Sequence, residues 1–156
     1  MTGSRVLVSL RVEAPPERTF AAFTDEIGEW WRPNDLFRFT DRQGTRLAFE
    51  PEPPERLVEV GADGEQFEIG PVLEWRPPER LVFGWRQAGF PEDRATEVSV
   101  RFDPVPTGTK VTVEHRGWDA LPQEHAARHG FPLEPFQRRL AEWWQVLLGS
   151  LADRAG

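Results

Sequence analysis

Apolar and polar residues alternate near the start of the chain, and this pattern predicts a β-strand over Arg5–Val12. Every second residue of the segment is apolar, so an extended chain turns one side toward a core and the other toward water. The prolines of Ala14–Glu17 favour the first turn of a helix directly after this strand. A second short helix is predicted over Glu26–Trp31, with the pair Thr24 and Asp25 as the break before it and its N-cap.

Six further strands are predicted between Arg46 and Gly117, where the same alternation recurs between segments that carry proline or glycine. Proline and glycine end the hydrogen-bonded ladder of a strand, and short connections favour antiparallel neighbours. The predicted strands are Arg46–Glu50, Arg56–Val60, Gln66–Trp75, Leu81–Gln87, Glu97–Asp103 and Lys110–Arg116.

The longest helical pattern begins at Pro135 and extends to about Ala152. Its apolar residues recur at helical spacing from Phe136 to Leu151 and form one broad stripe. A stripe of this width must be covered by other elements. The order of one strand, two short helices, six strands and one long helix therefore predicts an α+β fold, in which a curved antiparallel sheet of about seven strands wraps around the C-terminal helix.

Composition narrows the functional classes. The 156 residues fit one domain, so a single domain over residues 1–156 is expected. The chain has no cysteine, which favours a cytoplasmic location. Its formal net charge of -7 disfavours a nucleic-acid partner, and no apolar run is long enough for a membrane span. Phosphate-binding loops, the Gly-x-Ser-x-Gly elbow and the His-Glu-x-x-His pair do not occur.

Aromatic residues are the largest pool of candidates for a binding site, because the chain has seven Trp and eleven Phe but no Tyr. Alternation places Leu81, Phe83 and Trp85 on one strand face, and it places Leu73 on the same face as Trp75. Some of these rings are expected to line the concave side of the sheet opposite the last helix. Whether they pack as core or surround a cavity stays open. The candidate ligand-binding residues are Trp30, Trp31, Trp75, Phe83, Trp85, His115, Trp143 and Trp144.

His115 is the best candidate for a catalytic residue, because alternation over Lys110–Arg116 turns its ring toward the interior. The alternative is a structural histidine whose ring is satisfied by a hydrogen bond. His125 and His129 have the i, i+4 spacing of a metal pair, but their surroundings are hydrophilic and a glycine follows at once, so neither a metal nor a cofactor is expected. Arg46 and Glu50 are either polar anchors at a pocket mouth or part of a solvated outer face.

Several segments together resemble the START-like, or birch-pollen-allergen-like (SRPBCC), superfamily. Within it the chain is similar to the activator of heat-shock protein 90 ATPase homologue family. The resemblance covers nearly the whole sequence and implies the helix-grip fold and a START-like domain. The segments that carry it are Val12–Thr24, the pair Trp30 and Trp31, Val72–Trp85, Gly108–Trp118 and the Trp-containing final helix.

Relatives of this kind bind hydrophobic small molecules, cyclise bound polyketides or assist a chaperone ATPase. The leading hypothesis is the binding of a small hydrophobic or aromatic molecule in a cavity between the sheet and the C-terminal helix. One alternative is a polyketide cyclase or aromatase in which His115 is the general acid–base. The other is a co-chaperone-like interaction protein, whose partners are a chaperone or, in a homodimer, a second copy of the chain.

Overall fold

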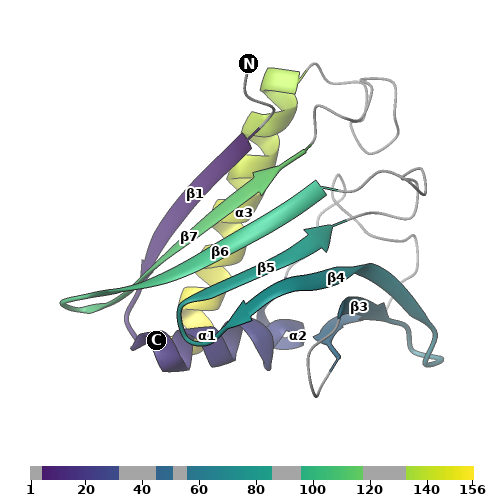
Figure 1. The fold of residues 1–156 in the computed structure, drawn as a ribbon, viewed down its shortest axis with the longest axis horizontal. Coiled ribbons are helices and arrows are strands. Elements are labelled where there is room, and N and C mark those ends of the chain that lie inside the picture. The colour runs from purple at the N-terminus through teal and green to yellow at the C-terminus, as the bar shows by residue number, and fades with distance from the viewer. Residues whose placement is uncertain (1–4, 32–44, 51–55, 86–95, 118–132) are drawn as a thin grey trace.

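One antiparallel sheet and three helices make up the structure, a computed structural model that describes residues 5–31, 45–50, 56–85, 96–117 and 133–156 (Figure 1). The sheet has seven strands in the order β1-β7-β6-β5-β4-β3-β2. Each strand from β2 onward pairs with the next one along the chain, and β1 closes the series by pairing with β7. The strands are β1 (Arg5–Val12), β2 (Arg46–Phe49), β3 (Arg56–Val60), β4 (Gln66–Arg76), β5 (Arg80–Trp85), β6 (Thr96–Val105) and β7 (Gly108–Arg116).

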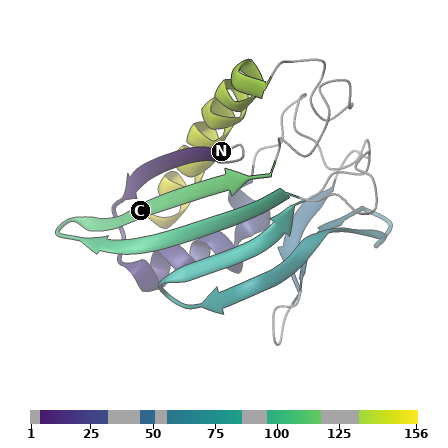
Figure 2. The same ribbon diagram turned by 45° about the horizontal axis from the view of Figure 1, so that its top comes forward.

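All three helices lie on one side of the sheet, as Figures 1 and 2 show together. They are α1 (Pro16–Thr24), α2 (Ile27–Trp30) and α3 (Leu133–Ala155). The predicted α+β fold, with a curved sheet around a long C-terminal helix and two short helices after the first strand, is confirmed. α3 begins at Leu133, two residues before the predicted Pro135. Pro135 fits within the first turn, because the N–H groups of that turn have no partner inside the helix and proline lacks only that group.

The side chain of Asp25 does not cap α2, so this prediction was wrong. The N–H of Asp25 bonds to the carbonyl of Ala21, and its backbone is still helical (φ -69°, ψ -28°). An N-cap residue needs a non-helical backbone, and this position falls to Glu26. The chain therefore turns from α1 into α2 without a side-chain cap.

The prediction that Leu73 shares a face with Trp75 was also wrong. The pairing of β4 with β5 shifts between Val72 and Glu74, so Leu73 is the extra residue of a β-bulge. The bulge resets the alternation, and Val72 and Trp75 both pack against the core. Leu73 is left 55% exposed.

The core lies between the concave side of the sheet and α3. The apolar stripe of α3 is fully buried from Leu140 to Leu151, against inward residues of β6 and β7 such as Val98 and Val113. The backbones of β4 and β5 approach closely at Gly70, where an added Cβ atom would overlap the carbonyl oxygen of Gly84. A side chain at this position would therefore push the two strands apart.

Candidate functional site

Six of the eight predicted ligand-binding residues form one closed group, which we call the aromatic cluster. Its rings contact one another directly: the centroid of Trp31 lies 5.8 Å from Trp85 and 5.5 Å from Trp143. No member is more than 7% exposed. The members are Trp30, Trp31, Trp85, His115, Trp143 and Trp144. These rings fill the space between β5, β7, α2 and α3 with each other, so the described part of this region is packed as core.

His115 lies at the base of the aromatic cluster, and both of its ring nitrogens have a partner. The indole Nε1–H of Trp144 lies 3.2 Å from Nδ1 and donates to it. Nε2 lies 2.8 Å from the hydroxyl oxygen of Thr96, and this hydroxyl donates to the carbonyl of Trp85 at 3.0 Å. Since Nδ1 accepts and the Thr96 proton is used, Nε2 carries the ring proton. The hydrogen bonds thus fix one neutral tautomer.

Burial lowers the pKa of His115 from 6.5 to about 3. A charged imidazolium would lose the solvation of water, and its second N–H would point at the indole N–H of Trp144. The orientation predicted from alternation is confirmed, since the ring faces the interior and is 0% exposed. The geometry favours the structural alternative, and a catalytic role of His115 stays a prediction.

The other two predicted residues, Phe83 and Trp75, lie toward the far edge of the sheet. Phe83 is fully buried and its ring centroid lies 5.7 Å from that of Phe49. Trp75 packs edge-on against Phe20 at 5.3 Å and lies 6.0 Å from Phe49. Trp75 is only half-buried. Part of this residue is therefore accessible to a neighbouring molecule.

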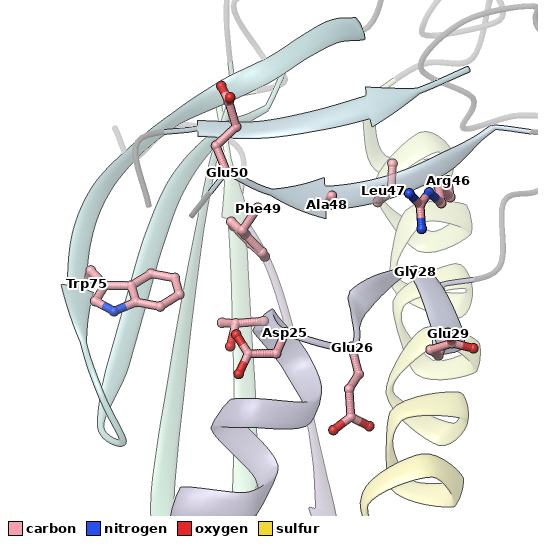
Figure 3. A pocket seen from close by; sticks show the side chains of 11 residues that line it. Asp25, Glu26, Gly28, Glu29, Arg46, Leu47, Ala48, Phe49, Glu50 and Trp75 are labelled. Carbon is pink, nitrogen blue, oxygen red and sulfur yellow. The ribbon is translucent and has the colours of Figure 1, made fainter. Parts of the chain in front are cut away.

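A pocket opens beside Trp75, and we call it the rim pocket. Its volume is about 270 Å³. Figure 3 shows the rings of Trp75 and Phe49 facing the same space above Asp25, while the carboxylates of Glu26 and Glu50 point away from it. The rim pocket is lined by Thr24, Asp25, Glu26, Gly28 and Glu29 from the helices, and by Arg46, Leu47, Ala48, Phe49, Glu50 and Trp75 from the sheet.

The acidic groups around the rim pocket differ in how they are held. Glu26 accepts hydrogen bonds from Arg18, at 2.5 Å, and from Arg154, at 2.7 Å. The hydrogen bond from Arg18 has the larger effect, and together the two bonds lower the pKa of Glu26. Asp25 and Glu29 are exposed and have no ion pair within the described chain. The pocket therefore has a fixed carboxylate behind it and two solvated ones at its entrance.

Sequence patterns found only part of the rim pocket. Trp75 was a candidate, and Arg46 and Glu50 were considered as anchors at a pocket mouth. The inward residues of β2 are Leu47 and Phe49, while Arg46 is exposed and Glu50 pairs with Arg56. The helix side of the pocket was missed. Its carboxylates stand in a turn where acidic residues are common, so no signal singled them out.

The structure gives no metal centre among the residues it describes, where no group of three ligating side chains occurs. His125 and His129 lie outside the described residues. Within the same residues no helix is long and apolar enough to cross a membrane.

A curved antiparallel sheet that grips a C-terminal helix, with a pocket at its rim, defines the helix-grip class of α+β proteins. Residues 13–153 match the family model described as activator of Hsp90 ATPase homolog 1-like protein. The chain belongs to this family, as its sequence segments indicated. A search of the curated proteins finds no match.

Solved structures with the same fold cover almost the whole chain. Protein MLL2253 from Mesorhizobium loti is 23% identical, with a TM-score of 0.63 over 98% of this chain and 99% of that one. The Aha1 dimer from Colwellia psychrerythraea is 20% identical, with a TM-score of 0.60 over 97% and 96%. The anthrahydroquino-Gama-pyrone synthase Txn09 is 29% identical, with a TM-score of 0.55 over 96% and 95%. The same fold thus occurs in proteins with different names, one of which is a synthase.

Proposed function

We propose that this chain is a single START-like cytoplasmic domain over residues 1–156 that binds a small aromatic molecule, and that the ligand sits in the rim pocket. One observation carries the proposal: Trp75 and Phe49 turn their rings toward an open volume of about 270 Å³. Binding pockets combine apolar walls with a few polar groups of this kind. The proposal places the ligand beside the aromatic cluster and not inside it.

The charges of the rim pocket select among aromatic ligands. Asp25 and Glu29 stand at the entrance, and Arg46 is the basic residue that lines it. An amino group on the ligand reaches a carboxylate while the ring stacks on Trp75, whose face also attracts a cation. A ligand with a carboxylate in the same place meets two like charges. The pocket therefore favours an aromatic amine over the matching acid.

Calorimetric titration with 1-naphthylmethylamine and with 1-naphthoic acid tests this proposal, because the two probes share a ring system and differ in charge. We expect saturable binding of the amine and at least a 10-fold weaker binding of the acid. Trp75→Phe removes the larger ring from the wall, and the loss of an aromatic contact worth about 1 kcal/mol weakens the amine roughly 5-fold or more.

Trp143→Phe is the matched control, because it makes the same change within the aromatic cluster. It should leave the affinity for the amine unchanged. Binding that is lost in Trp143→Phe and kept in Trp75→Phe would place the ligand inside the cluster and refute the rim location. No binding of either probe to a folded protein would refute this function.

A second candidate function is stimulation of a chaperone ATPase, which is favoured by the family match over residues 13–153. It needs an interaction surface and no ligand. Addition of the chain to a bacterial Hsp90 should then raise the rate of ATP hydrolysis, and an unchanged rate at excess protein would exclude it. The cyclase alternative gains nothing from His115, whose two nitrogens are occupied within the core.

A further inference from the structure

The side of the sheet that faces away from α3, which we call the outer sheet face, carries no helix of the described structure (Figures 1 and 2). Side chains from five strands point outward there, and six basic ones stand against five acidic ones. The face is therefore slightly net positive on a chain whose net charge is -7. Its basic residues are Arg11, Arg76, Arg80, Arg101, Lys110 and Arg116, and its acidic residues are Glu68, Glu74, Glu97, Asp103 and Glu114.

Three arginines stand side by side on the outer sheet face, at the end of β4, the start of β5 and the adjoining part of β6. Arg76 is the direct cross-strand partner of Arg80, and Arg80 is the direct partner of Arg101. We call them the arginine row. Like charges in directly opposed positions destabilise a sheet. The row therefore stores a repulsion that an added anion would relieve.

Three carboxylates lie within 4 Å of the arginine row. One oxygen of Glu74 serves two arginines, at 3.2 Å from Arg80 Nε and 3.8 Å from Arg76 Nη1. Glu79 lies 3.7 Å from Arg76, and Asp103 lies 3.9 Å from Arg101. The side chains remain well exposed: Arg76 is 62% exposed, Arg80 is 42% exposed and Arg101 is 58% exposed. Most of their N–H groups are thus open to a ligand, and guanidinium groups pair best with planar carboxylates.

Thr112 supplies a second, independent observation. It is the cross-strand partner of Arg101 on the same face. Its side chain is 7% exposed, and its hydroxyl has no hydrogen-bond partner within the described chain. A buried hydroxyl without a partner costs free energy, so this group marks a place where an acceptor from outside completes the bonding.

From these observations we propose that the outer sheet face is the docking surface for an acidic segment of a partner protein. The arginine row spans two strand spacings, about 10 Å. Three carboxylates at alternate positions of an extended segment span about 13 Å, a mismatch that long glutamate and arginine side chains can take up.

A fluorescein-labelled peptide of alternating glutamate and serine, twelve residues long, tests the proposal by fluorescence anisotropy with the full chain. We expect binding that weakens with added salt, and a peptide with lysine in place of glutamate should not bind. Arg80→Glu with Arg101→Glu should weaken the glutamate peptide at least 10-fold. Thr112→Val should weaken it a few-fold without lowering the melting temperature, because the lost hydroxyl has no partner in the free protein.

Arg138→Glu with Arg139→Glu is the matched control, since it makes the same change of net charge on the exposed side of α3. Equal weakening by both double variants would overturn the proposal, because the attraction would then belong to the net charge alone. If the reversal at Arg80 and Arg101 unfolds the chain, Arg80→Gln with Arg101→Gln replaces it. Tighter binding of a single-stranded RNA than of the peptide, self-association through this face, or no peptide binding at low salt would each refute the proposed partner.

Discussion

Replacement of His115 by glutamine should make the stability of the protein less sensitive to acid. In the folded chain the pKa of this group is lowered to about 3, because the ring is fully buried. In the unfolded chain it titrates near its ordinary value of about 6.5. Below that value the unfolded chain therefore takes up a proton that the folded chain refuses, and the free energy of unfolding falls as the pH falls.

The size of the effect follows from the two pKa values. Each pH unit between them removes about 1.4 kcal/mol, so lowering the pH from 7 to 4.5 removes roughly 3 kcal/mol through His115 alone. Above pH 6.5 both states are neutral and the group adds no pH dependence. Carboxylates contribute further acid sensitivity, but they contribute it equally to wild type and variant.

Urea unfolding at several pH values between 7 and 4.5 measures this difference. His115→Gln should be less stable than wild type at pH 7, because a fully buried ring and a donor–acceptor pair are lost. The gap should then narrow by roughly 3 kcal/mol toward pH 4.5.

Thr96→Val is the matched control, since it removes the partner of Nε2 and keeps the ring. It should lower stability and keep the pH dependence of the wild type. Parallel curves for wild type and His115→Gln would refute the neutral, buried state of this histidine.

Two further changes test the fold. Gly70→Ala should destabilise the fold by roughly 1–3 kcal/mol, because the added Cβ overlaps the carbonyl of Gly84. Gly149→Ala should stabilise it by about 0.5–1 kcal/mol, because this position of α3 has open space around it. Urea unfolding that ranks the two variants otherwise contradicts this geometry. Glu26→Gln should lower the melting temperature by about 2–4 °C at pH 7. That difference should shrink as the pH falls below 4.5 through the lowered pKa of Glu26, and Asp25→Asn should show none of it.

The strands and the long helix could be predicted because each has a periodic pattern of its own. Arg5–Val12 and Arg56–Val60 were found with their bounds, since one face of each is buried and alternation reports it. Leu73 could not be placed, because a β-bulge depends on the partner strand and leaves no mark in the local pattern. Periodicity thus specifies elements well and irregularities within them poorly.

The candidate site was harder to predict than the fold, because it is made of contacts between distant segments. Alternation turned His115 inward, but its partners Thr96 and Trp144 are 19 and 29 residues away. The rim pocket joins the turn between α1 and α2 to β2 and β4. Nothing in a single sequence states which of several aromatic residues will pack together and which will stay beside an open volume.

The packing of the aromatic cluster explains why a ligand would bind at the rim. To enter between the sheet and α3, a ligand must separate rings that now contact each other, and each contact of this kind is worth about 0.5–1.5 kcal/mol beyond the burial of its area. The bond that Ser150 donates to the carbonyl of Trp30 at 2.6 Å also ties α3 to α2. Trp75 needs no such change, because this residue is already partly exposed and lines the rim pocket. A ligand that reaches Trp75 therefore gains its contacts without loss of core packing.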